Sequence, residues 1–196
     1  MPCSRQSPAC PPETLRETGE KRLLVTCHRR ESWGSGLSEI GEAVAALATE
    51  SRVRIDVVLH PNPIVAEPLR QRLGDLPAVN LLAPLSHGSL VERMRGCDLV
   101  LSDSGGIQEE APALGIPLLI LRDKTERPEA LASGNARLVG VKAERIIAEA
   151  GQLLDDPAGL AAMAHRSFPF GDGKSAPRIA GIVHDWFAKR QRAGRA

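Results

Sequence analysis

The segment 103–106 holds the residues whose types and spacing most clearly suggest chemistry. Gly105 and Gly106 follow a short apolar run and open a helical pattern, so a ligand can approach the backbone closely there. The first N–H groups of a helix lack partners and carry partial positive charge, and Ser104 adds a hydroxyl. Glu110 follows one helical turn after Gly106, where a carboxylate can accept hydrogen bonds from both hydroxyls of a ribose. Together these residues predict a phosphate site with a ribose contact.

A tight turn followed by an exposed acidic helix is the alternative interpretation of the same segment. Two adjacent glycines are a weak signal by themselves. The sequence lacks the Gly-Lys-Ser/Thr ending of a P-loop and the full Gly-x-Gly-x-x-Gly dinucleotide motif, so we exclude these two motifs.

Basic and imidazole side chains follow three other apolar runs. His28 and Arg29 follow the first run, His60 the second, and Arg127 lies in a polar segment after the fifth. Arginine presents a planar fork that suits phosphate, and histidine can donate a hydrogen bond or carry a proton. These positions fit an anion site. A surface charge cluster around Arg29 and a structural role for His60 remain as alternatives.

Composition narrows the function classes. Net charge is +1, which argues against a nucleic-acid surface or a basic membrane patch, and no apolar run reaches membrane-spanning length. Hydrophobic residues make up 42% of the 196 residues, enough to bury the core of one domain. The four cysteines have no metal-ligand spacing and predict a reduced, cytoplasmic protein without a zinc site; they are Cys3, Cys10, Cys27 and Cys97.

Strand and helix patterns alternate about six times along the chain. Strands are predicted at residues 22–27, 53–59, 79–82, 99–101, 117–121 and 137–139. Helices are predicted over 37–47, from about 67, over 87–96, from 104 to about 115, over 126–133 behind a Thr125 cap, over 146–154, after Asp156-Pro157, and over 179–187. The order predicts an α/β fold, a Rossmann-like parallel sheet with helices on both faces. Ligands of such sheets bind outside the carboxyl ends of the strands, where the polar residues above lie.

Three segments are expected. Residues 1–20 are rich in Pro, Ser, Arg and Glu and predict a flexible leader or linker, 21–190 the folded domain, and 191–196 a tail. The last helix carries an apolar stripe that includes Trp186 and Phe187. An uncovered stripe of this kind would favour self-association, such as a homodimer.

Five motifs, in this order, resemble the successive signatures of the non-hydrolysing UDP-N-acetylglucosamine 2-epimerases. They are His28-Arg29-Arg30-Glu31, His60-Pro61-Asn62-Pro63, Asp103 to Pro112, Arg122 to Glu129, and Phe168 to Gly173. The resemblance extends from about Arg22 to Phe187 and implies the second domain of a GT-B-type two-domain enzyme. It also implies conversion of UDP-N-acetylglucosamine to UDP-N-acetylmannosamine by elimination and re-addition of UDP, with no metal or redox cofactor.

The resemblance assigns roles residue by residue within the UDP site. Ser104, Gly105 and Gly106 would hold the diphosphate, Glu110 would bind the ribose, and Arg127 would contact the phosphates. The substrate implied is therefore a UDP-sugar.

Other roles follow from the same resemblance. His28 would be a catalytic-site residue that stabilises the leaving UDP, and Arg29 and His60 would line an allosteric site for a second substrate molecule. Leu85 and Leu90 stand in the uracil loop, where the family often has polar or aromatic residues. Base contacts would then be mainly backbone and apolar.

The family's acidic residues for proton transfer at C2 lie in a first domain that this sequence does not match. General acid–base catalysis needs such groups within hydrogen-bond reach of the substrate. We therefore expect the chain alone to bind UDP weakly and to turn over little or nothing, with a separately encoded N-terminal domain as a partner. The alternatives are a catalytically inactive UDP-sugar-binding module and the nucleotide-binding half of a GT-B glycosyltransferase.

Overall fold

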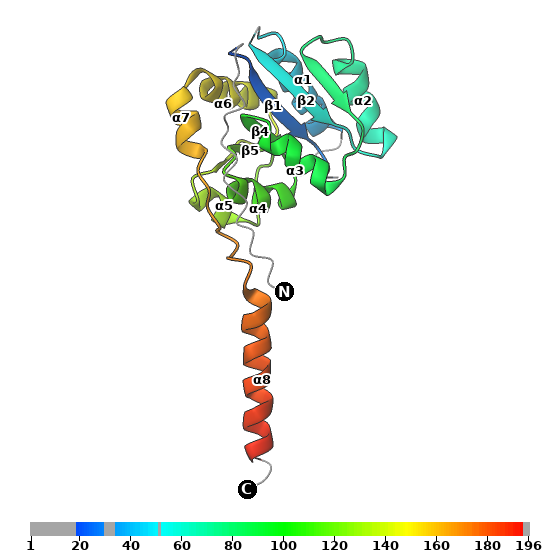
Figure 1. The fold of residues 1–196 in the computed structure, drawn as a ribbon. Helices are drawn as coiled ribbons and strands as arrows, with labels where there is room; N and C mark the ends of the chain where they lie inside the picture. The colour runs from blue at the N-terminus through cyan, green and yellow to red at the C-terminus, as the bar shows by residue number, and fades with distance from the viewer. Residues whose placement is uncertain (1–18, 30–33, 51, 194–196) are drawn as a thin grey trace.

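The structure is a computed structural model that describes residues 19–29, 34–50 and 52–193. Figure 1 shows a layered α/β body from which a single long helix projects. Residues 1–18 of the predicted leader lie outside the described residues. Arg30 and Glu31 of the first motif also lie outside them. Among the helices that the structure describes, none has both the length and the apolar character of a membrane span.

Six parallel strands form the central sheet in the order β3-β2-β1-β4-β5-β6. The strands are β1 (Lys21–Thr26), β2 (Val53–Val58), β3 (Val79–Leu82), β4 (Leu99–Ser102), β5 (Leu118–Ile120) and β6 (Ala136–Leu138). The strand order reverses between β1 and β4, which pair from Leu23↔Leu99 to Thr26↔Ser102. Ligands of doubly wound sheets bind at such a switch point, outside the carboxyl ends of the strands. The predicted parallel α/β sheet is confirmed.

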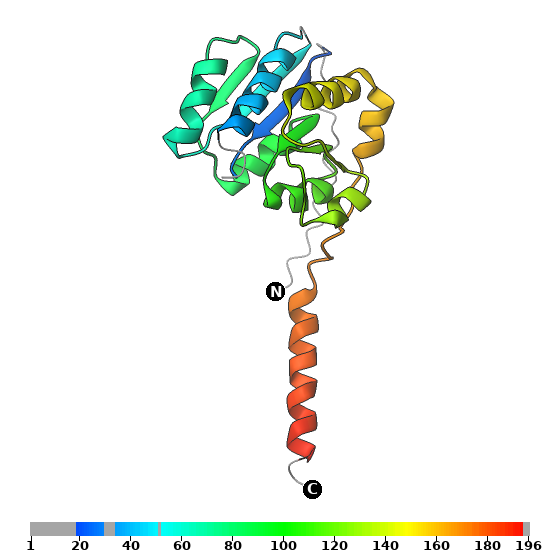
Figure 2. The same cartoon turned by 180° about the vertical axis from the view of Figure 1, so that it is seen from behind.

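Helices cover both faces of the sheet, as predicted. They are α1 (Ser35–Leu47), α2 (Pro63–Leu73), α3 (His87–Arg95), α4 (Gly105–Leu114), α5 (Pro128–Ala132), α6 (Ala143–Asp155) and α7 (Pro157–Met163), while α8 (Ser175–Ala193) lies away from the sheet. One face carries α1, α2, α6 and α7, whose apolar residues share a core cluster with the sheet. The opposite face carries α3, α4 and α5 over a second cluster (Figures 1 and 2).

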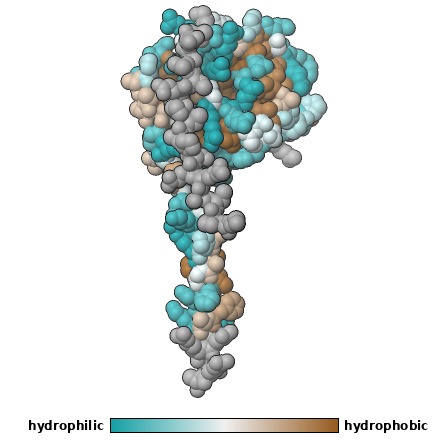
Figure 3. Space-filling model, in the orientation of Figure 1, coloured by the Kyte–Doolittle hydropathy of each residue, from teal (hydrophilic) through white to brown (hydrophobic). Residues whose placement is uncertain are grey.

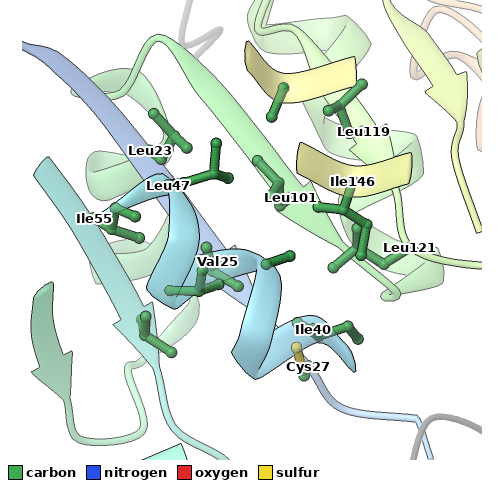
Figure 4. Packing of buried hydrophobic residues seen from close by; sticks show 14 of the residues in the cluster. Leu23, Val25, Cys27, Ile40, Leu47, Ile55, Leu101, Leu119, Leu121 and Ile146 are labelled. Carbon is green, nitrogen blue, oxygen red and sulfur yellow. The ribbon is translucent and has the colours of Figure 1, made fainter. Parts of the chain in front are cut away.

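The central strands are rich in apolar residues because this part of the sheet is buried on both faces, as in β4 and β5. In β1, Leu23 and Val25 pack into the first cluster, whereas Leu24 between them packs into the second. Figure 4 shows the first cluster, with Ile40 and Leu47 of α1 lying over the strands. Burying a side chain of this size is worth about 1.5–3 kcal/mol, so this two-sided burial fixes where the strand ends lie.

The start of α2 differs from the prediction. We expected Pro68 to delay the regular helix to about residue 67, but α2 begins at Pro63 and contains Pro68. The Asn62 side chain accepts a hydrogen bond from the Ile64 N–H at 3.0 Å, and Pro63 occupies the first turn, where its missing N–H costs nothing. The cap and the buried face of the helix outweigh the one hydrogen bond that Pro68 cannot donate.

The start of α5 also differs. Thr125 was expected to cap a helix beginning at residue 126, but α5 begins at Pro128. The Thr125 hydroxyl instead donates to Gln108 Oε1 at 2.5 Å and accepts from the Arg127 N–H at 3.1 Å. Thr125 therefore joins the loop after β5 to α4 and fixes the backbone of Arg127.

Helix α8 projects from the body, and its apolar stripe is exposed (Figures 1 and 3). Its exposed apolar residues are Ile179, Ile182, Val183, Trp186 and Phe187, with exposed fractions from 46% to 70%. The prediction of an uncovered stripe is confirmed. The three-segment division of the chain stays a prediction.

Candidate functional site

The candidate site begins at the first turn of α4. Ser104 is the N-cap residue of α4, yet its side chain accepts no hydrogen bond from the helix. Its backbone N–H donates to Ser102 Oγ at 3.0 Å, which holds the exit of β4 in place. The N–H groups of Gly105 and Gly106 open the helix and, by helix geometry, have no carbonyl partner within it. The first turn of α4 thus lies at the switch point, where the sequence predicts a phosphate site.

Asp103 brings the turn after β1 beside the turn after β4. Its buried carboxylate accepts the His28 N–H at Oδ1 (2.8 Å) and the Arg29 N–H at Oδ2 (3.0 Å). At the last pair of the β1–β4 ladder, the Thr26 and Ser102 hydroxyls share a buried 2.7 Å hydrogen bond. His28 and Arg29 are therefore held close to the start of α4.

Arg127 lies against the glycine turn. A Cβ atom added to Gly105 would lie 2.8 Å from Arg127 Nη1, closer than such atoms approach, so the guanidinium occupies the space that glycine leaves open. Arg127 Nε donates to Glu109 Oε1 at 2.6 Å, and Nη1 donates to Glu126 Oε1 at 2.5 Å. The Glu109 carboxylate, helped by Glu126, raises the pKa of Arg127. A fixed cation thus adds to the positive end of the α4 dipole.

Glu126 binds three guanidinium groups at once. Oε1 accepts from Arg29 Nη2 at 2.7 Å and from Arg127, while Oε2 accepts from Arg122 Nη1 at 2.6 Å. The backbone N–H of the same residue and the Arg122 guanidinium lower the pKa of Glu126 to about 2. Sequence reasoning did not assign Glu126 or Arg122 to the site. Both residues follow β5 at the ligand-binding edge of the sheet, and this position could have indicated that they belong to the site.

Glu110 has one occupied and one free carboxylate oxygen. Oε1 lies 3.1 Å from His87 Nε2 at the start of α3. Oε2 is buried and has no hydrogen-bond partner. A buried acceptor without a partner is costly, so this oxygen is suited to a hydroxyl donor from a ligand. His87 was not predicted as a site residue.

His28 and His60 meet where β1 and β2 end. Their ring centroids are 5.7 Å apart, and His60 Nδ1 accepts the Asn62 N–H at 3.0 Å. Burial lowers the pKa of His28, the Asp103 charge opposes that change, and His60 adds to it. Of the two residues predicted to line a second site, His60 thus contacts His28, whereas Arg29 contacts Glu126.

A separate groove of about 790 Å³ lies near the opposite, amino-terminal ends of β1, β2 and β3. Its charged side chains pair with one another: Arg93 with Asp56 at 2.9 Å, and Arg54 with Glu20 at 3.3 Å. Ligands of parallel α/β sheets bind outside the carboxyl ends of the strands, so the switch point, rather than this groove, is the better candidate for binding an anion. Within the described ranges, no group of three or more His, Cys, Asp or Glu side chains could hold a metal ion.

Comparison with known proteins identifies the family. Residues 4–184 match the sequence model of a family described as UDP-N-acetylglucosamine 2-epimerase. This chain belongs to the UDP-N-acetylglucosamine 2-epimerase family. The predicted resemblance is confirmed, and the family match covers all the described residues of the candidate site.

Relatives and solved structures agree with the match. UDP-N-acetylglucosamine 2-epimerase of Escherichia coli K12 is 46% identical over 161 residues, which are 82% of this chain and 43% of that protein. The Neisseria meningitidis enzyme, solved bound to UDP-GlcNAc, superposes with a TM-score of 0.81 at 40% identity, over 85% of this chain and 45% of that one. A Staphylococcus aureus MnaA–UDP co-structure superposes with a TM-score of 0.81 at 33% identity, over 87% of this chain and 47% of that one. The chain therefore spans less than half the length of these relatives, and the predicted GT-B-type half is confirmed.

Proposed function

We propose that this chain binds the UDP portion of UDP-N-acetylglucosamine and forms the UDP-binding half of a 2-epimerase. The observation that carries the proposal is the start of α4, where the N–H groups of Gly105 and Gly106 open the helix and the Arg127 guanidinium lies against Gly105. A helix N-terminus next to a fixed cation binds diphosphate well. The similarity to relatives solved with UDP-GlcNAc or UDP supports the same nucleotide.

The proposed contacts to UDP come from α4 and from the loop after β5. The diphosphate would lie on Ser104, Gly105 and Gly106 and accept from Arg127. The ribose hydroxyls would donate to the buried, unpartnered Oε2 of Glu110.

His28 would act on the leaving group. Loss of the C2 proton is followed by cleavage of the bond between C1 and the phosphate oxygen, and the electron pair leaves with UDP. A hydrogen bond from His28 to the diphosphate would stabilise that charge. Return of a proton to the opposite face of C2, together with re-addition of UDP at C1 of the glucal, would complete the inversion at C2. Arg29 and His60 would contact a second substrate molecule.

We further propose that the chain alone does not turn over. Glu109 and Glu126 are bound to arginines, and a carboxylate whose pKa is about 2 is a poor base for a C2 proton. A partner with the features of the relatives' other half would supply the acid and base. A homodimer and a cytoplasmic location also remain proposals, and no metal or redox cofactor is invoked.

Calorimetric titration with UDP and with 2′-deoxy-UDP tests the site. Wild type should bind UDP saturably and prefer it over the deoxy compound about tenfold, the worth of one hydrogen bond to a charged group. Glu110→Gln keeps the side-chain size but removes the acceptor charge, and it should erase the preference. Absence of UDP binding by folded wild type would reject the proposal.

NMR of UDP-N-acetylglucosamine mixed with the chain tests catalysis. We expect no UDP-N-acetylmannosamine from the chain alone and turnover once the partner half is added. No turnover in either sample would favour the inactive binding module instead. The glycosyltransferase alternative is disfavoured by the 46% identity to an epimerase.

A further inference from the structure

The carboxylate of Asp103 occupies an unusual position in the site. β1 and β4 stop pairing at Thr26 and Ser102, so the N–H groups of His28 and Arg29, two and three residues further along the chain, lie beyond the end of that ladder, which offers them no acceptor. Asp103 supplies both missing acceptors, one oxygen to the His28 N–H at 2.8 Å and the other to the Arg29 N–H at 3.0 Å. The side chain is fully buried at 0% exposure. Its two oxygens thus replace the sheet at the point where the ligand-binding edge begins.

We propose that Asp103 is a positioning residue for the UDP site: its buried carboxylate holds the turn that carries His28 and Arg29 beside the first turn of α4. The inference rests on the proposed function and extends it to a residue that touches no substrate. The negative charge of the carboxylate is required, because both of its oxygens must accept a hydrogen bond. An amide in the same place would turn a donor toward one of the two N–H groups.

The charge also acts on the imidazole of His28. Among the residues that the structure describes, the charged or titratable groups that shift the pKa of this ring are Asp103 at the end of β4 and His60 at the end of β2. Burial and His60 lower the pKa of His28, and Asp103 alone of these opposes the change. Removal of the carboxylate charge should therefore lower the pKa of His28 further and leave less of the imidazolium available to a diphosphate.

The chain offers a matched control for Asp103→Asn. Thr26 and Ser102 link the same two strands at the last pair of their ladder, through a buried hydrogen bond of 2.7 Å. Thr26→Val removes that bond without changing charge or the shape of the side chain. Ser102 Oγ still accepts the Ser104 N–H, so the start of α4 is kept. A purely structural role for Asp103 would make the two variants behave alike.

The experiment measures three properties of wild type, Asp103→Asn and Thr26→Val. The His28 pKa comes from NMR titration of ring signals, assigned with His28→Gln; UDP affinity comes from calorimetry, and stability from urea unfolding. Asp103→Asn should lower the His28 pKa and weaken UDP binding at least tenfold. Thr26→Val should lose stability but keep the His28 pKa and bind UDP within twofold of wild type.

The proposal is overturned if Asp103→Asn leaves the His28 pKa and UDP affinity unchanged, or if both variants lose affinity in proportion to stability. If Asp103→Asn fails to fold, amide hydrogen exchange measured on the wild-type protein tests the proposal instead. Slow exchange of the His28 and Arg29 amides, matching that of the β1 amides, supports the proposal that Asp103 holds this turn, and fast exchange rejects it. If wild type binds no UDP, the proposed function fails, while the His28 pKa comparison still tests Asp103.

Discussion

Substitution of Gly105 by alanine should weaken UDP binding without destabilising the fold. The new Cβ would lie 2.8 Å from Arg127 Nη1, 3.0 Å from Cζ and 3.2 Å from Nη2, whereas ordinary contacts are about 3.5–4 Å. The guanidinium must move by about 0.5–1 Å. It ends a flexible side chain, so the backbone need not follow. Alanine also favours a helix over glycine by up to about 1 kcal/mol, which opposes any loss of stability.

The expected loss of affinity follows from the displaced cation. A hydrogen bond to a charged group contributes about 1.5–3 kcal/mol, so Kd for UDP should rise about 10- to 150-fold. Calorimetry measures this change, and urea unfolding checks that stability is retained.

A double-mutant cycle with Arg127→Ala shows whether the effect passes through Arg127. In that background Gly105→Ala has no guanidinium to displace, so its further effect on Kd should be less than about threefold, well short of additivity. Additive losses, or reduced stability without reduced affinity, would refute the assignment of Arg127 to the diphosphate.

Three further predictions concern separate features. Both Gly106→Asp and Gly106→Asn should fit sterically, because a Cβ atom at Gly106 meets only Ser104 Oγ at 3.9 Å. The aspartate carboxylate repels the diphosphate and should abolish UDP binding, whereas the neutral asparagine should only weaken it. Unchanged calorimetric affinity in the aspartate variant would contradict this prediction. The lowered pKa of Glu126, about 2 against an ordinary value near 4.3, means that its contribution to stability is complete above about pH 4.3 and is lost as the pH falls toward 2. Urea unfolding at pH 5 and pH 3 should therefore show a smaller acid loss in Glu126→Gln than in wild type, and equal losses would disprove the coupling. The exposed stripe of α8 should drive self-association that Trp186→Glu reduces; light scattering that finds wild type monomeric at high concentration counts against it.

The sheet could be predicted from the sequence because its central strands are apolar on both faces. Runs such as Leu99 to Leu101 have no polar face and lie between turn residues, a pattern typical of a strand that is buried on both faces. The start of α2 was missed because the breaking effect of Pro68 was weighed above the cap at Asn62.

The site could be predicted only in part, for a physical reason. The glycine turn is local, and Ser104 to Gly106 carry their signal in their own sequence. Asp103 and His28 are 75 residues apart, and their contact exists only because β1 and β4 are neighbours in the sheet. The same holds for Arg29 and Glu126, which are 97 residues apart. Such pairs depend on strand order, which motif spacing along the chain does not reveal.

Backbone amide shifts in ¹⁵N-labelled protein titrated with UDP test the central claim most directly. The account predicts that the largest shifts, with saturation, occur at Gly105, Gly106 and Ile107, because their N–H groups would receive the diphosphate. Shifts centred elsewhere, for example around the groove near Arg54 and Arg93, or no shifts at all, would contradict it.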